Sequence, residues 1–162
     1  AAAQRSPVLL CVDATCGNGH DTIELARLVG APGGRVVALD IDPVAVEATR
    51  RRVRRHAAER TISVLLRSHA VAPPGVAPRS ALLVVFNLGY LPGSHVGETT
   101  ADTVTTTVAE TTLGALTSWA LPAVAPGGAA SVTVYPGHAA GRREAAALAA
   151  FARSLAPSTW RA

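Results

Sequence analysis

The fold is indicated most clearly by one stretch, Val12-Asp-Ala-Thr-Cys-Gly-Asn-Gly-His-Asp-Thr22. Its pattern is typical of a glycine turn between a strand and a helix. The apolar run over 8–12 that leads into it is typical of a strand covered on both faces of a parallel sheet. A helix is predicted from about Asp21, since Asp21 and Glu24 have the spacing of a capping box. Glycine allows the turn to be tight and lets the backbone approach a ligand closely. The stretch therefore predicts a strand–turn–helix unit with a ligand at its turn.

The rest of the chain repeats this alternation of apolar runs and helical stretches. Strands are expected over 35–39, 62–66, 81–86 and 129–135, and helices over 42–55, from Thr99 past Trp119, and over 142–155. Asp42 is expected to cap the second helix, with Pro43 in its first turn. Leu28 and Val44 are expected on the buried faces of the first two helices, and 126–128 as a turn. The pattern predicts one domain over 1–162, an α/β fold of the Rossmann-like class with a doubly wound, mostly parallel sheet.

Composition supports a globular domain and excludes several classes of protein. Hydrophobic residues make up 49% of the 162 residues and charged residues 16%, which allows a core and argues against disorder. No apolar run approaches the roughly 18 residues of a membrane span. The net charge of +4 comes with arginine as the only strong base, which permits an RNA partner without demonstrating one. Cys11 and Cys16 are too few for a disulfide framework or a zinc site. We expect buried thiols, no metal, and an intracellular location, in the cytoplasm or an organelle matrix of a chloroplast or mitochondrion.

Two acidic residues and one threonine indicate the class of cofactor. Asp40 ends the second strand about 20 residues after the glycines, where a carboxylate can accept hydrogen bonds from both ribose hydroxyls. This arrangement is shared by dinucleotide and S-adenosylmethionine sites. Thr22, however, stands where the dinucleotide fingerprint needs a third glycine. Asp13 adds a carboxylate that suits the methionine ammonium of S-adenosylmethionine and would gain nothing from a pyrophosphate. S-adenosylmethionine is favoured, and an NAD-type oxidoreductase is the alternative.

The segment Phe86-Asn-Leu-Gly-Tyr90-Leu-Pro-Gly93 follows the fourth predicted strand and suits an amine substrate. An asparagine side chain and a neighbouring backbone carbonyl can both accept hydrogen bonds from an amine. Tyr90 can stack on a base or wall off the transferred methyl group. The spacing Asn-x-x-Tyr is similar to the Asn-Pro-Pro-Tyr loop of amino-methyltransferases, with both prolines replaced. Because turns rich in Asn, Gly and Pro are common, the motif alone does not settle the substrate.

Together with Tyr135-Pro-Gly-His138, these two segments closely resemble the YtqB-type family, long labelled rRNA methylases. The resemblance covers nearly the whole chain. It implies a class I methyltransferase that uses S-adenosyl-L-methionine and acts on the anticodon region of tRNA. The implied reaction converts the 5-aminomethyl group of wobble (2-thio)uridine to 5-methylaminomethyl.

The resemblance also implies roles for individual residues. The methionine half of the cofactor would be held by Asp13, Thr15, Gly17, Asn18, Gly19, His20, Asp21 and Thr22. The ribose would be held by Asp40 and Ile41, and the adenine by Ser68 and His69. Asn87 would contact the cofactor, and the substrate would be bound by Leu88, Gly89, Tyr90, His95, Tyr135 and His138. The implied catalytic residues are Asn87, Tyr90 and His138. The proton that the amine must lose would go to His95, to His138, or to solvent before binding.

Some features depart from the family or stay open. Residues 94–98 differ from the family's pattern. The family continues past the last helix with a strand pair, so the chain is interpreted as trimmed at both ends and its fifth strand as an exposed edge. The arginine cluster over 50–55 is either a solvated helix face or a phosphate-binding surface. Alternative functions are methylation of another RNA amine, in rRNA or at adenine N6, and a non-catalytic domain that binds S-adenosylmethionine or RNA.

Overall fold

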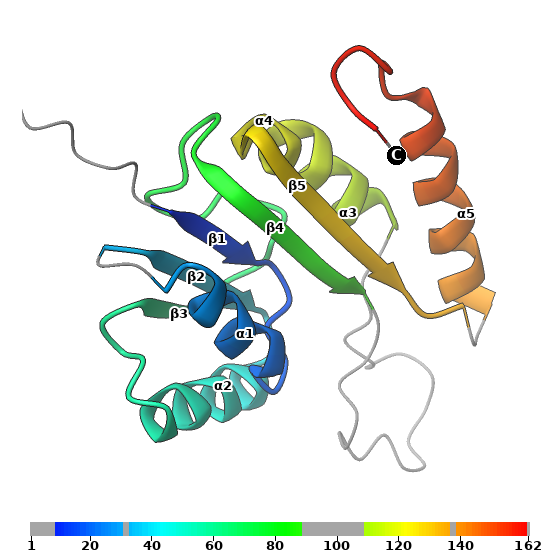
Figure 1. Ribbon diagram of the computed structural model, residues 1–162. Helices are drawn as coiled ribbons and strands as arrows, with labels where there is room; N and C mark the ends of the chain where they lie inside the picture. Colours follow the sequence, from blue (N-terminus) through cyan, green and yellow to red (C-terminus); the bar gives the residue numbers. More distant parts are fainter. Residues whose placement is uncertain (1–8, 31–32, 89–108, 137–138, 162) are drawn as a thin grey trace, which may run out of the picture.

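A parallel sheet of five strands forms the centre of the part of the chain that is described (Figure 1). The computed structural model describes residues 9–30, 33–88, 109–136 and 139–161. The strands are β1 (Leu10–Asp13), β2 (Arg35–Asp40), β3 (Ile62–Leu66), β4 (Ala81–Leu88) and β5 (Val124–Val134), in the order β3-β2-β1-β4-β5. The chain moves outward from β1 to β3 and then returns to β4 on the other side. The doubly wound α/β prediction is confirmed, and the switch point, where such sheets bind ligands, lies between β1 and β4.

Helices cover both faces of this sheet (Figure 1). They are α1 (His20–Leu28), α2 (Pro43–Arg55), α3 (Ala109–Ala115), the π-helical turn η1 (Leu116–Ala120), α4 (Leu121–Ala123) and α5 (Ala139–Ser154). Successive residues of β1 point to opposite faces, as the strand period requires. Cys11 packs in one core cluster with Ile23 of α1, whereas Val12 packs in another with Trp119 and Leu148 of the later helices. The helices α1 and α2 therefore lie on one face, and α3 to α5 on the other.

The start of α1 differs from the prediction. The residue before the helix is Gly19, in the left-handed conformation with φ of 76°, and no side chain caps the first turn. The expected capping box of Asp21 and Glu24 is therefore wrong. The helix begins at His20, one residue earlier than predicted, so Asp21 lies inside it and is not its N-cap. The Asp21 carboxylate instead accepts a hydrogen bond from the Asn87 side chain. In contrast, Asp42 caps α2 as predicted, since its Oδ1 accepts the Val44 N–H at 2.8 Å.

Two residues expected in the core are exposed. Leu28 is 55% exposed and Val44 is 65% exposed. The next residue is buried instead in both cases: Val29, which caps the C-terminus of α1, and Ala45 in α2. Adjacent helical residues are about 100° apart around the axis, so a difference of one position is enough to move a side chain from the buried face to solvent. Leu116 and Trp119, also expected to face inward, are buried at 3% and 6% exposure.

The C-terminal halves of β4 and β5 define one wall of the switch point. β4 runs to Leu88, two residues further than predicted, so Asn87 belongs to the strand itself. The expected turn at 126–128 is wrong as a separate element, because these residues lie inside β5. They form an irregularity between the pairs Ala81↔Val124 and Leu83↔Ala129, which places extra residues opposite one position of β4. β5 is an edge of the described sheet, as expected.

Candidate functional site

The loop from Asp13 to His20 lies at the switch point, between the end of β1 and the start of α1. Gly17 and Gly19 have φ angles of 50° and 76°, in the region that disfavours side chains. A Cβ at Gly19 would lie 2.8 Å from Thr49 Oγ1 and 3.0 Å from Thr49 Cα. Gly19 is therefore required by close packing against α2, and this is a different reason from the ligand approach expected from the sequence.

Asp13 anchors the beginning of this loop from inside the protein. Its side chain is fully buried, with Oδ2 accepting a hydrogen bond from Thr22 Oγ1 and Oδ1 accepting one from the Thr15 N–H at 3.3 Å. Burial raises the pKa of Asp13 to about 6, although both hydrogen bonds act to lower it. Thr22, which replaces the third glycine of a dinucleotide fingerprint, thus serves to hold a carboxylate. The contact of Asp13 with a cofactor ammonium stays a prediction.

Asp40 joins the same loop to the end of β2. Its Oδ2 accepts the Gly17 N–H at 2.9 Å, and its Oδ1 accepts the Asp42 N–H at 3.0 Å. The residue is partly exposed, and the next side chain, Ile41, is 49% exposed. Each carboxylate oxygen can accept a second hydrogen bond. Asp40 can therefore fix the loop and still accept hydrogen bonds from ribose hydroxyls.

Asn87 links the end of β4 to the loop and to α1. Its backbone N–H donates to Thr15 Oγ1 at 2.7 Å, and its Nδ2 donates to Asp21 Oδ2. Because a carboxylate only accepts, the amide nitrogen must face Asp21. The side-chain oxygen Oδ1 is then the group that Asn87 can offer to an amine. The adjacent Leu88 is 1% exposed and its side chain belongs to the core.

The residues after β3 present an unsatisfied polar atom. His69 is 8% exposed, and its ring meets Phe86 edge-on with ring centroids 5.6 Å apart. Its carbonyl accepts a hydrogen bond from Trp119 Nε1 at 2.8 Å, but its ring Nε2 is buried without a hydrogen-bond partner in the described part of the chain. Burial lowers the pKa of His69, with the charge of Asp40 acting in the opposite direction. The preceding Ser68 Oγ accepts the Ala70 N–H at 3.1 Å.

The remaining predicted residues fall into three groups. Tyr135 is 55% exposed and follows β5, whose Val134 pairs with Leu88 at the end of β4. Asn18 and His20 both contact α2. The predicted residues Gly89, Tyr90, His95 and His138 lie outside the described residues.

Sequence reasoning missed two residues of α2 that hold the loop. Thr49 Oγ1 donates to the Gly17 carbonyl at 2.8 Å. Arg52 donates from Nε to the Asn18 carbonyl at 2.7 Å and from Nη2 to His20 Nε2 at 2.8 Å. A polar Thr49 on an otherwise apolar buried stripe was a usable signal. Arg52 gave no such signal in the sequence, because it lies within a run of arginines.

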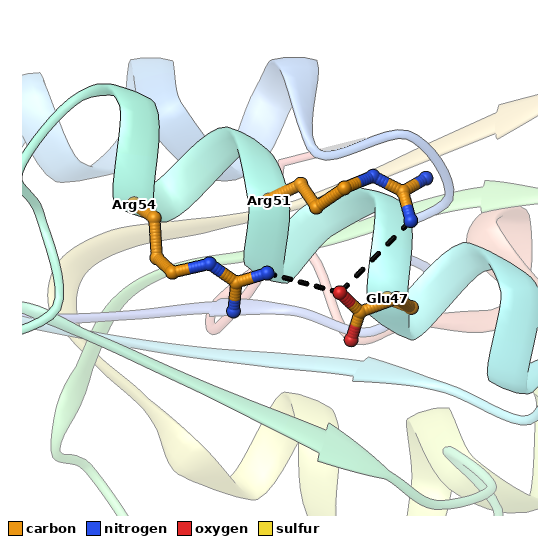
Figure 2. Close-up of polar contacts among 3 residues, drawn as sticks. All are labelled: Glu47, Arg51 and Arg54. Atoms are coloured by element: carbon orange, nitrogen blue, oxygen red, sulfur yellow. Dashed lines mark hydrogen bonds and ion pairs between the residues drawn. The ribbon is translucent and has the colours of Figure 1, made fainter.

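The other arginines of α2 support the solvated-face interpretation. Arg51 and Arg54 both pair with Glu47, at 3.9 Å and 2.9 Å, and the three side chains are about half exposed (Figure 2). Exposed pairs of this kind contribute little to stability.

The described part of the chain also contains an apolar groove away from the switch point. This groove of about 940 Å³ lies between β5 and α5 and is lined by Val132, Leu148, Phe151 and Trp160 among others, but by no residue of the predicted cofactor site. Among the described residues, no cluster of three or more His, Cys, Asp or Glu side chains could hold a metal ion. No helix within those ranges is both long and apolar enough to cross a membrane.

The chain is similar to methyltransferases of known sequence or structure. The chain is 34% identical over 160 residues to the chloroplastic tRNA (mnm(5)s(2)U34)-methyltransferase of Arabidopsis thaliana, which covers 92% of this chain, while the chain spans only 54% of that relative. A solved structure of a Clostridium thermocellum protein described as an rRNA methylase matches with a TM-score of 0.79 and 31% identity, over 93% of this chain and 77% of the other. A Streptococcus mutans protein described as a methyltransferase, solved in complex with SAH, matches with a TM-score of 0.74 and 28% identity, over 93% and 74%.

One family model covers most of the described chain, from the second residue of β2 through α5. It is described as "Putative rRNA methylase" and matches residues 36–162. This chain therefore belongs to that rRNA methylase family.

Proposed function

We propose that the chain is an S-adenosylmethionine-dependent methyltransferase that acts on tRNA. In the proposed reaction, the 5-aminomethyl group of wobble (2-thio)uridine, in the anticodon region, becomes 5-methylaminomethyl. The observation that carries this proposal is the position of Asn87. Its backbone bonds to Thr15 and its side chain to Asp21, so an acceptor for an amine is joined directly to the glycine loop. The relative from Arabidopsis thaliana, whose name gives the same nucleoside, supports the choice of substrate.

The residues at the switch point fit S-adenosylmethionine. Asp40 retains acceptor capacity for ribose hydroxyls, and the exposed Ile41 beside it offers an apolar surface to the adenosine. The buried Nε2 of His69, which has no hydrogen-bond partner among the described residues, supplies a polar atom that could bond to an adenine edge. Thr22 occupies the space that a dinucleotide site leaves to glycine, and its hydroxyl is bonded to Asp13. When bound, the cofactor supplies an electrophilic methyl group on a sulfonium.

The protein's part in the proposed reaction is mostly to position the amine. Oδ1 of Asn87 would accept an N–H of the aminomethyl group and so direct its lone pair, while Asp21 keeps the amide from rotating. Asn87 cannot act as a base. An alkylamine is largely protonated at neutral pH, so a proton must leave before attack. We assign that proton to His95, His138 or solvent, and the pocket wall to Tyr90, Tyr135 and His138, on the family resemblance.

The cofactor is tested by calorimetric titration of the purified protein with SAH and, separately, with NAD. We expect SAH to bind and NAD to show no heat of binding. Binding of NAD but not SAH would overturn the proposal in favour of an oxidoreductase. The substrate is tested by nucleoside mass spectrometry of tRNA and rRNA after methyl transfer. A methylated adenosine or a methylated rRNA would keep the enzyme class and overturn the substrate, and SAH binding without any methyl transfer would indicate a non-catalytic domain.

A further inference from the structure

Arg52 differs from the arginines beside it in what it contacts. Arg51 and Arg54 pair with Glu47 on the outer side of α2 (Figure 2). Arg52 instead reaches the glycine loop, with Nε on the Asn18 carbonyl at 2.7 Å and Nη2 on His20 Nε2 at 2.8 Å. These are charge-assisted hydrogen bonds, which are stronger than neutral ones. The cluster that looked uniform in the sequence therefore contains one residue directed at the predicted cofactor loop.

The contacts from α2 fix the orientation of the loop's peptide groups. Thr49 holds the Gly17 carbonyl, and Arg52 holds the Asn18 carbonyl. In a trans peptide, the N–H of the next residue points opposite to the carbonyl, and the described residues contain no cis peptide. The Gly19 N–H follows this rule, since it points back to the Cys16 carbonyl at 2.7 Å. By the same rule the Asn18 N–H is directed away from α2, because it shares a peptide group with the Gly17 carbonyl that Thr49 holds.

Arg52 also determines which ring nitrogen of His20 is the acceptor. A guanidinium has five N–H donors and no acceptor. His20 Nε2 must therefore act as the acceptor in this contact, and Nδ1 is the ring nitrogen that remains to donate. The loop thus presents backbone and imidazole N–H groups as donors, and an anionic group such as a carboxylate is the ligand that such donors favour.

We propose that Arg52 is a positioning residue that holds the Asn18–Gly19 peptide and the His20 ring in place, so that the glycine loop can bind the methionine carboxylate of the cofactor. This inference rests on the proposed function. Arg52 itself does not touch the cofactor in this account, and its effect is limited to the methionine half. Adenosine binding, which depends on Asp40 and His69 at other strands, is independent of it.

The test compares two ligands that differ in the methionine half. SAH carries the amino-acid group, whereas 5′-methylthioadenosine keeps the adenosine and thioether but lacks the carboxylate and the ammonium. Dissociation constants for both are measured by calorimetry for the wild type, Arg52→Gln, Arg52→Lys and the control Arg51→Gln. Because two charge-assisted bonds are lost, we expect Arg52→Gln to bind SAH about tenfold more weakly and methylthioadenosine unchanged. Arg52→Lys, which cannot span both acceptors, should show a smaller loss for SAH alone, and Arg51→Gln no loss.

The possible outcomes separate the inference from the function on which it rests. If the wild type binds neither ligand, the proposed function fails and the inference fails with it. If the wild type binds SAH and Arg52→Gln binds it equally well, only the inference is overturned. An equal loss for SAH and methylthioadenosine would also overturn it, because Arg52 would then act on the fold as a whole. Should Arg52→Gln fail to fold, the ratio of the two constants for Arg52→Lys decides in the same way.

Discussion

Replacing the buried Asp13 by asparagine should stabilise the fold at neutral pH. Burial raises the pKa of Asp13 to about 6, from an ordinary value of 3.8. One pKa unit corresponds to about 1.4 kcal/mol, so the ionised carboxylate costs the folded state about 3 kcal/mol above pH 6. Asparagine keeps an acceptor for the Thr15 N–H and offers an N–H to the Thr22 hydroxyl. Weaker neutral hydrogen bonds offset about 1 kcal/mol of this, which leaves a net gain of about 2 kcal/mol for Asp13→Asn.

The pH dependence of the free energy of unfolding predicts the same direction of change for Asp13→Asn. Since the folded pKa of Asp13 lies above its unfolded value, the folded protein binds the extra proton between about pH 4 and pH 6. Its contribution to stability is fully present below about pH 4 and is lost as the pH rises through 6. Asp13→Asn lacks this loss. Urea unfolding of both proteins between pH 4 and pH 7.5 measures the difference, with Asp42→Asn as control because asparagine caps a helix as well as aspartate does.

Two results would refute this reasoning about Asp13. One is a variant that is less stable than the wild type at pH 7.5, and the other is a stability difference that stays constant from pH 4 to pH 6. The same variant should bind SAH more weakly, because the cofactor ammonium would lose a charged partner. A gain in stability together with a loss of cofactor affinity would show that the carboxylate is kept for binding and at a cost to the fold.

Three further variants test other parts of the structure. Gly19→Ala should lower the free energy of unfolding by about 1–3 kcal/mol, since its Cβ would lie 2.8 Å from Thr49 Oγ1 at a φ of 76°; a loss under about 0.5 kcal/mol in urea unfolding would contradict the packing. Asn87→Ala should reduce kcat about 100-fold, as loss of a positioned hydrogen-bond acceptor can do, with SAH affinity retained; near-normal turnover would remove Asn87 from the amine site. The pair Arg51→Gln and Arg54→Gln should leave the salt dependence of tRNA binding unchanged, because both side chains are half-exposed partners of Glu47; a slope of log K against log salt reduced by about 2 would instead indicate phosphate contacts.

The fold was largely predictable because its signals are local. Asp42 and Pro43 mark the start of α2 by their own chemistry, and β3 has the bounds expected from its apolar run. Where local pattern was ambiguous, prediction failed. Leu28 and Val29 are adjacent and apolar, and only tertiary packing shows which one faces the sheet. Residues 126–128 carry a turn signal, but glycine also permits the irregularity found inside β5.

The sequence predicted where the candidate site residues lie in the fold, but not the hydrogen bonds that hold them together. The glycine loop, Asp40 and Asn87 could be placed at strand ends from sequence alone, and the sheet order brings those ends together. The contacts from Thr49 and Arg52 span 32 and 34 residues of sequence. No local pattern encodes such a contact, because it depends on how α2 packs against the loop.

The most direct test of the central claim is methyl transfer to tRNA that carries 5-aminomethyl-(2-thio)uridine at the wobble position. The protein is incubated with this tRNA and with S-adenosylmethionine labelled in its methyl group, and the digested nucleosides are analysed by mass spectrometry. We expect the label to appear in the 5-methylaminomethyl nucleoside and most of it to be lost with Asn87→Ala. Label in any other nucleoside, or no label from a folded protein that binds SAH, would overturn the proposed substrate and reaction.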